Sequence, residues 1–178
     1  MKEPGIVRKL DNLGRLVIPK EIRRCLRIKE GSPIEFGLLS TGEIVLCKYS
    51  LVNQISDFAE EFCEVISDTF DCVTIIADRD KIISSKGVSK KHLKDMMLSN
   101  QIMEIDKQYY LANDTEKIKP IIEEDGITYK SQLIYPIVIQ GEKEGVIILA
   151  STDKANMFNN EHILSLKLIS KFLSLQLE

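Results

Sequence analysis

The chain has 178 residues, 44% of them hydrophobic and 29% charged, which is typical of a globular protein with one large or two small domains. No apolar run approaches the roughly 20 residues needed to span a bilayer, and the N-terminus leads into no signal-peptide core. We therefore expect a cytoplasmic protein without membrane contact. The four cysteines form no C-x-x-C pair, so no disulfide framework and no metal site are predicted.

The net charge of −3 is the sum of a basic N-terminal part, residues 1–50, here called the head, and an acidic remainder, residues 51–178. Residues 1–50 carry ten Lys/Arg and six Asp/Glu, hence +4, whereas residues 51–178 carry fourteen and twenty-one, hence −7. Long-range potential follows such local clusters and not the whole-chain average, so a polyanionic partner is expected for the head alone. We place two domains in these ranges, 1–50 and 51–178.

The first domain is predicted to contain four short strands and one short helix. The strands cover 5–10, 15–18, 33–39 and 43–47. Asp11-Asn12-Leu13-Gly14 is typical of a reversing turn, and Ser40-Thr41-Gly42 of a hairpin loop. Pro19 suits the first position of a helix that continues through Leu26, and Gly31 would end it. So small a unit buries little apolar surface by itself, and we expect two chains to interleave as an obligate dimer.

Basic residues gather around the first turn and the helix. Nine lie between Lys2 and Lys29, against three acidic residues. Arg8 and Arg15 fall on opposite sides of the turn, so that with the arginines of the helix they could converge on one face. The planar guanidinium fork binds phosphate or a guanine edge with two hydrogen bonds. The alternative is a solvated basic surface with no partner.

The stretch from Gly5 to Arg24, with its Leu-Gly-Arg-x-Val-Ile-Pro core and Ile-Arg-Arg pair, resembles the AbrB-type transition-state regulator family. The resemblance implies a looped-hinge-helix, swapped-hairpin β domain formed by two chains, which binds double-stranded DNA. The family's DNA-contacting arginines match four positions, Arg8, Arg15, Arg23 and Arg24. On charge grounds we add two phosphate contacts, Lys9 and Lys20.

The second domain is predicted to begin and end with helices. Heptad-like spacing favours a connecting helix over 51–66. Its apolar positions are Leu51, Ile55, Phe58, Phe62 and Val65. A final helix over 160–177 has one apolar stripe at Ile163, Leu166, Ile169, Leu173 and Leu177. It has a second stripe at Leu164, Leu168, Phe172 and Leu175. Two stripes exceed what one sheet can cover, so the surplus face should meet the first helix or another subunit, giving a dimer of dimers.

Between these helices the pattern predicts a mostly antiparallel sheet. Its strands are placed at 72–78, 81–85, 119–122, 128–139 and 144–150. A polar helix is predicted to begin at Ser89, with Leu93, Met96, Met97 and Ile102 facing inward.

Two segments of this domain resemble a GAF domain, an α/β sandwich with an antiparallel sheet. They are Tyr135–Ile139 through Gly145–Leu149, and Phe158-Asn159-Asn160-Glu161 at the start of the last helix. Such domains often sense small ligands. This chain has neither the Cys-His pair of bilin-binding members nor the Asn-Lys-x-Phe-Asp-Glu signature of cyclic-nucleotide binders, so the ligand is unknown. A ligand sensor and a ligand-free oligomerisation domain both stay open.

Catalysis is not predicted. No G-x-S-x-G, H-E-x-x-H or phosphate-binding glycine motif occurs, and His92 lies far from His162 in the sequence. Five acidic residues could in principle pair as a catalytic acid and base, although adjacent acids in turns are usually solvated: Asp78, Asp80, Glu123, Glu124 and Asp125. We therefore expect no catalytic residue, no metal and no cofactor.

Both domains in this order resemble regulators of late gene expression in spore-forming bacteria, which implies activation of some promoters and repression of others. An antitoxin is the alternative, because similar N-terminal folds neutralise toxins. Antitoxins usually append a short disordered tail, however, whereas this chain appends a folded domain.

Overall fold

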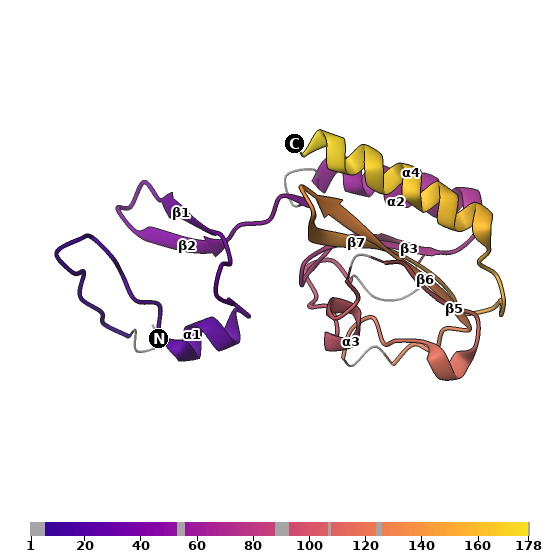
Figure 1. Cartoon of the computed structure of the whole chain (residues 1–178), viewed down its shortest axis with the longest axis horizontal. Coiled ribbons are helices and arrows are strands. Elements are labelled where there is room, and N and C mark those ends of the chain that lie inside the picture. Colours follow the sequence, from indigo (N-terminus) through magenta and orange to yellow (C-terminus); the bar gives the residue numbers. More distant parts are fainter. Residues whose placement is uncertain (1–5, 53–55, 88–92, 107, 124–125, 178) are drawn as a thin grey trace. The chain divides into compact units, whose positions relative to one another are not determined.

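A computed structural model describes residues 6–52, 56–87, 93–106, 108–123 and 126–177. The chain divides into two compact units, Met1–Tyr49 and Ser50–Glu178 (Figure 1). No helix in the described ranges combines the length and the apolar character that crossing a membrane requires.

The first unit contains one short helix and one hairpin. Its elements are α1 (Lys20–Cys25), β1 (Ile34–Leu38) and β2 (Ile44–Lys48). β1 and β2 pair antiparallel, with Phe36 opposite Leu46, so the predicted hairpin is confirmed. Gly42, with φ +83°, supplies the left-handed conformation that this loop requires.

Helix α1 is shorter than the sequence indicated. Pro19 is its N-cap and not its first residue as expected, and the helix ends at Cys25 and not near Gly31. The N–H of Ile28 donates to the Arg23 carbonyl (2.7 Å), and that of Arg27 to the Arg24 carbonyl (3.2 Å). With Arg27 in the left-handed region, φ 51°, these bonds form a Schellman ending.

The two strands predicted over 5–10 and 15–18 are not formed in the described residues. Both segments lie outside any ladder, and the backbone bonds between them are confined to the turn, where Asp11 N–H donates to the Arg15 carbonyl (3.2 Å). A strand needs a neighbour for its N–H and C=O groups. Pattern alone could not show that this neighbour is missing within the single chain.

The second unit is built on an antiparallel five-stranded sheet with the order β4-β3-β7-β6-β5. Its strands are β3 (Val73–Asp78), β4 (Ile82–Lys86), β5 (Tyr110–Ala112), β6 (Ser131–Ile139) and β7 (Glu142–Ser151). The predicted antiparallel sheet is confirmed. β3 is an interior strand between β4 and β7, and all six of its residues are buried, because both faces of the sheet are covered.

Two helices, α2 (Ser56–Phe70) and α4 (Asn160–Gln176), lie side by side on one face of this sheet (Figure 1). The Phe62 and Phe172 rings meet edge to face between them, with centroids 5.6 Å apart. The opposite face carries loops, α3 (Asn100–Met103) and the short 3-10 helix η2 (Thr115–Lys117). Successive strand residues alternate between the two cores: Ile76 packs under the helices and Ile75 on the other side.

The helix predicted from Ser89 is wrong for its described part. Ser89 itself lies outside the described residues, and residues 93–99 are not helical. Met97 forms a bridge with Lys81, and the Ile82 N–H donates to the Met96 carbonyl (2.9 Å). Because this segment pairs with the turn and start of β4, its apolar residues reach the core without helical spacing.

The strand predicted over 119–122 is also wrong, because no ladder forms there. The segment instead meets α3: the Ser99 N–H donates to the Ile121 carbonyl (2.8 Å). Ile121 is fully buried. An apolar run indicated burial correctly, but burial does not require a strand.

One edge of β6 is closed by helix α4. β5 pairs only with residues Gln132 to Ile134 of β6, so the later part of this edge has no strand neighbour in the described chain. Ser170 donates its hydroxyl to the Pro136 carbonyl (2.8 Å), and Ser174 donates to the Val138 carbonyl (2.9 Å). Helix hydroxyls thus replace a sixth strand, which keeps the carbonyls satisfied.

Candidate nucleic-acid interface

All six residues that the sequence marks as DNA contacts have exposed side chains in the first unit: Arg8, Lys9, Arg15, Lys20, Arg23 and Arg24. Arg8 and Lys9 precede the Asp11 turn and Arg15 follows it. Lys20 opens α1, while Arg23 and Arg24 occupy its last turn. Three of them therefore flank one turn and three lie on one short helix, all in the basic unit.

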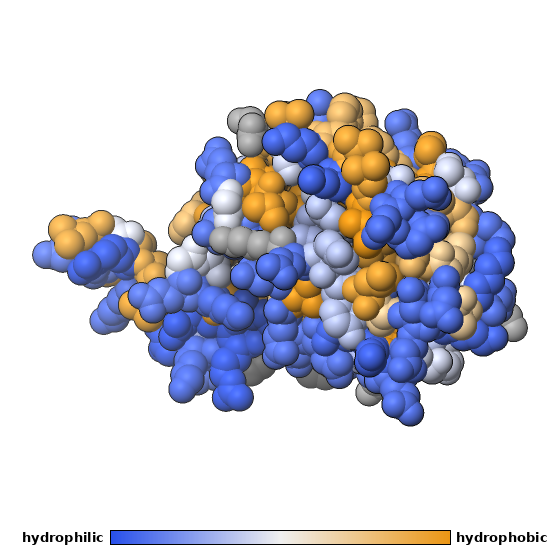
Figure 2. All heavy atoms as spheres, turned by 45° about the vertical axis from the view of Figure 1, so that its right-hand side comes forward, coloured by the Kyte–Doolittle hydropathy of each residue, from blue (hydrophilic) through white to orange (hydrophobic). Residues whose placement is uncertain are grey.

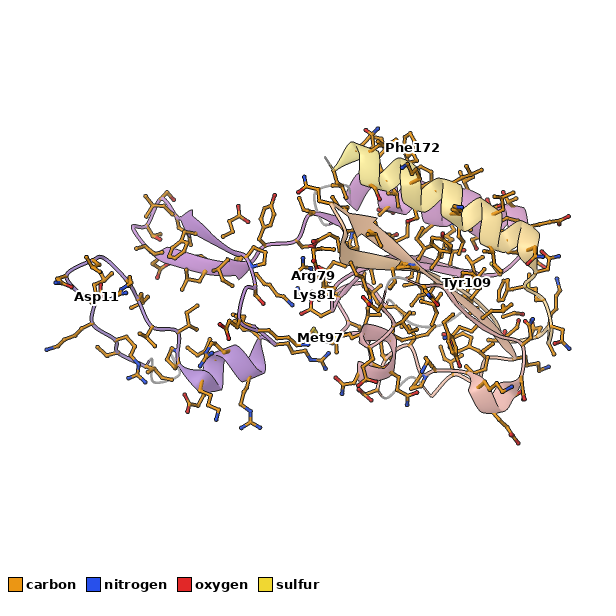
Figure 3. The ribbon with its side chains drawn as sticks, in the orientation of Figure 1. Asp11, Arg79, Lys81, Met97, Tyr109 and Phe172 are labelled. Carbon is orange, nitrogen blue, oxygen red and sulfur yellow. The ribbon has the colours of Figure 1, made fainter. Side chains whose placement is uncertain are left out.

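The turn between Arg8 and Arg15 is held together by Asp11, which Figure 3 labels. Its Oδ1 accepts the backbone N–H groups of Leu13 (3.0 Å) and Arg15 (2.8 Å). Its Oδ2 accepts the Nε–H of Arg15 at 2.6 Å. Gly14, at φ +74°, closes the turn by donating its N–H to the Asp11 carbonyl (3.1 Å). The sequence predicted a turn here but not that one carboxylate would organise it.

The polarity of α1 suits its charges. Glu21 lies in the first turn, and Arg23 and Arg24 lie in the last. Partial positive charge at a helix N-terminus favours the acid there, and partial negative charge at the C-terminus favours the two arginines. The Schellman bonds at the helix end fix the backbone from which both arginines project.

The first unit has almost no core of its own. Pro19 is the only buried residue among residues 6–49. Large apolar side chains are instead open to solvent, for example Val7 (86% exposed) and Leu38 (77%). A hollow of about 380 Å³ is lined mainly by aliphatic groups, including Leu16, Ile22 and Leu46.

The second unit also leaves apolar side chains uncovered, along α2 and α4. Six are exposed: Phe58, Val65, Leu164, Leu168, Phe172 and Leu175. Figure 2 shows apolar side chains at the top of this unit, where α2 and α4 lie in Figure 1. The last four form the predicted second stripe of α4, which faces away from the sheet. Ile55, predicted for the first helix, lies outside the described residues.

The acidic residues considered for catalysis are structural in the described chain. Asp78 and Asp80 are buried and not solvated as expected. Burial raises the pKa of the Asp78 carboxyl, which accepts the N–H groups of Asp80 (2.9 Å) and Lys81 (2.7 Å). Glu123 accepts the Asn100 N–H (2.9 Å) at the start of α3.

The histidines and remaining acids add no reaction centre within the described ranges. His162 forms a capping box with Asn159 at the start of α4. His92, Glu124 and Asp125 lie outside the described residues. No group of three potential metal ligands occurs in the described part of the chain. Sequence reasoning missed the forked pair of Arg79 with Glu144 (Nε to Oε2, 3.0 Å), because its members are distant along the chain.

An exposed basic turn and helix, joined to an antiparallel sheet with paired helices on one face, define a DNA-binding regulator with an AbrB-like head and a GAF-like second domain. Residues 54–178 match the family described as "Stage V sporulation protein T C-terminal, transcription factor". Over 182 aligned positions the chain is 36% identical to Stage V sporulation protein T of Bacillus subtilis, covering 100% of this chain and 99% of that protein. The chain belongs to this family of transcription regulators, and not to a family of enzymes.

Further comparisons agree with each domain separately. Residues 7–53 match the family described as "Antidote-toxin recognition MazE, bacterial antitoxin". Transition state regulatory protein AbrB of Bacillus subtilis is 34% identical over 51% of this chain and 84% of that protein. The GAF domain of an Acinetobacter phosphoenolpyruvate-protein phosphotransferase superposes with a TM-score of 0.59 at 16% identity, covering 73% of this chain and 83% of that one. The predicted AbrB-like and GAF-like folds are confirmed.

Proposed function

We propose that the chain binds double-stranded DNA through Arg8, Arg15, Arg23 and Arg24, with Lys9 and Lys20 on phosphates. The observation that carries this proposal is the exposure of all six side chains, which flank one turn or lie on one helix of a unit with net charge +4. Arginine serves both phosphate and base-edge contacts. As a regulator of sporulation genes, the protein acts in the cytoplasm and both activates and represses promoters.

The DNA-binding unit works as a homodimer in this proposal. Burying apolar surface stabilises a fold by about 25 cal/mol per Å², and residues 6–49 bury almost none within one chain. The segments 6–10 and 15–18 lack strand neighbours, and no apolar side chain among the described residues fills the hollow beside Leu16 and Leu46. A second copy that interleaves its own segments supplies both the neighbouring strands and the apolar side chains.

Two such dimers join through α2 and α4 of the second unit. The exposed stripe on α4 and the neighbouring Phe58 and Val65 make an apolar face suited to a four-helix contact. Charge agrees with this pairing, because α2 carries a run of acidic residues while α4 carries Lys167 and Lys171. The second unit is thus an oligomerisation scaffold. Sensing of a small, unidentified ligand is a separate role that rests on the GAF-like fold alone.

DNA binding is tested with the full chain and a fluorescent duplex. We expect Arg8→Ala or Arg24→Ala to abolish the anisotropy rise while leaving the thermal unfolding midpoint nearly unchanged, since both side chains are exposed. Lys117→Ala removes one exposed charge from the second unit and is the matched control. Intact binding by both arginine variants would refute the assignment.

A further inference from the structure

Asp11 is an acid at the centre of a surface proposed to bind a polyanion. A carboxylate there repels phosphates, so charge alone disfavours it. Its hydrogen bonds give it another role. Oδ1 accepts two backbone N–H groups of the turn, and Oδ2 accepts the Nε–H of Arg15 at 2.6 Å.

The contact between Asp11 and Arg15 leaves most of the Arg15 guanidinium exposed to solvent. Of the guanidinium N–H groups, only Nε–H, the one nearest the side-chain stem, donates to the Asp11 carboxylate, and the Arg15 side chain stays 71% exposed. The outer Nη groups therefore face solvent, where a phosphate or a base edge can meet them in the forked geometry. A free arginine would lose much rotamer freedom on binding DNA, whereas a clamped one has lost part of it beforehand.

Arg15 differs in this respect from the other three arginines. Among the described residues it is the only one of the four with a carboxylate partner. The hydrogen bonds from Arg15, first its backbone N–H and then its side chain, hold the pKa of the Asp11 carboxyl below the ordinary value. The carboxylate is therefore ionised at neutral pH.

We propose that Asp11 is a positioning residue of the DNA interface, whose carboxylate holds the Arg15 guanidinium in the orientation that meets DNA. This inference rests on the proposed DNA-binding function. It opposes the prediction from net charge: removing an acid from a basic surface should tighten DNA binding, whereas loss of positioning should weaken it.

The test is a double-mutant cycle in the full chain, with duplex affinity measured at one salt concentration. In Asp11→Asn the amide oxygen still accepts the turn N–H groups, but its NH₂ group cannot accept from Nε. We expect Asp11→Asn to weaken binding about fivefold in the wild-type background, a coupling within the range known for contacting residues. In the Arg15→Ala background the same change should cause no loss. The thermal unfolding midpoint of each variant shows whether the turn remains folded.

Two results would overturn the positioning role. One is unchanged or tighter binding by Asp11→Asn while Arg15→Ala weakens binding, which leaves the proposed function intact. The other is an equal loss in both backgrounds, which assigns Asp11 to the turn alone. If Arg15→Ala itself binds as wild type, the proposed role of Arg15 fails instead, so the two failures are distinguishable.

Discussion

Two serine hydroxyls on α4 donate hydrogen bonds to β6 carbonyls that have no neighbouring strand in the described chain. Ser170 is buried, and its hydroxyl donates to the carbonyl of the buried Pro136 at 2.8 Å. Removing the Ser170 hydroxyl leaves the buried Pro136 carbonyl without this hydrogen bond, which lowers the free energy of unfolding by about 1–3 kcal/mol. Ser165, on the same helix, only donates back to the Glu161 carbonyl within α4 (2.9 Å).

We therefore expect Ser170→Ala to lower the free energy of unfolding by about 1–3 kcal/mol. The control Ser165→Ala should be neutral or raise it by a few tenths of a kcal/mol, because alanine favours a helix more than serine. Urea unfolding at one fixed protein concentration measures both. Equal effects of the two substitutions would show that the Ser170 contact adds no stability.

For single residues, the sequence predicted which side chains are exposed better than it predicted which side chains contact each other. Runs of arginine and lysine in the head were expected on the surface, and Arg8, Arg15 and Arg24 are exposed. The partners of buried groups were not foreseen. Ser170 with Pro136, and Arg79 with Glu144, join residues that only the folded sheet brings together.

The exposed stripe of α4 is a feature of the whole element. Leu168 is 65% exposed at its middle, with Leu164 and Leu175 on the same face. An apolar row of this length on an isolated surface favours association. In the proposed assembly this row is buried between two dimers.

We predict that Leu168→Glu converts a four-chain species into a two-chain species, since the new charge would be buried without a partner. Size-exclusion chromatography with light scattering at micromolar concentration gives the mass. Lys117→Glu places the same side chain on η2, on the opposite face of the sheet from α2 and α4, and should leave the mass unchanged. A wild-type mass for Leu168→Glu would contradict the helix contact.

Elements with strong periodicity were predicted to exist, although α2 covers Ser56–Phe70 and not the expected 51–66. Elements defined by distant pairing were not predicted. The two stripes of α4 indicated its length and its buried and exposed faces correctly. Residues 93–99 have apolar spacing compatible with a helix, yet they form a turn at Asp95, with φ 67°, followed by the pairing of Met97 with Lys81. In the head, residues 6–10 and 15–18 alternate like strands but have no ladder in one chain. Local pattern carries no information about which neighbour is present.

On the scale of the whole molecule, charge is divided between the two units. The head carries +4 and the remainder −7, so only the head attracts a polyanion. In the proposed assembly, an acidic scaffold brings several basic heads to one duplex. Binding by linked heads strengthens the complex without any new contact, through their effective concentration.

The salt dependence of DNA affinity tests whether the basic first unit binds the phosphate backbone. For the full chain on one duplex, log K should fall linearly with log[salt], at a slope of about −0.9 for each phosphate neutralised. Lys20→Ala should weaken binding and make the slope shallower by about 0.9 for each chain that contacts DNA. A flat dependence in the wild-type protein, or the same slope and affinity in Lys20→Ala, would show that this surface does not bind DNA as proposed.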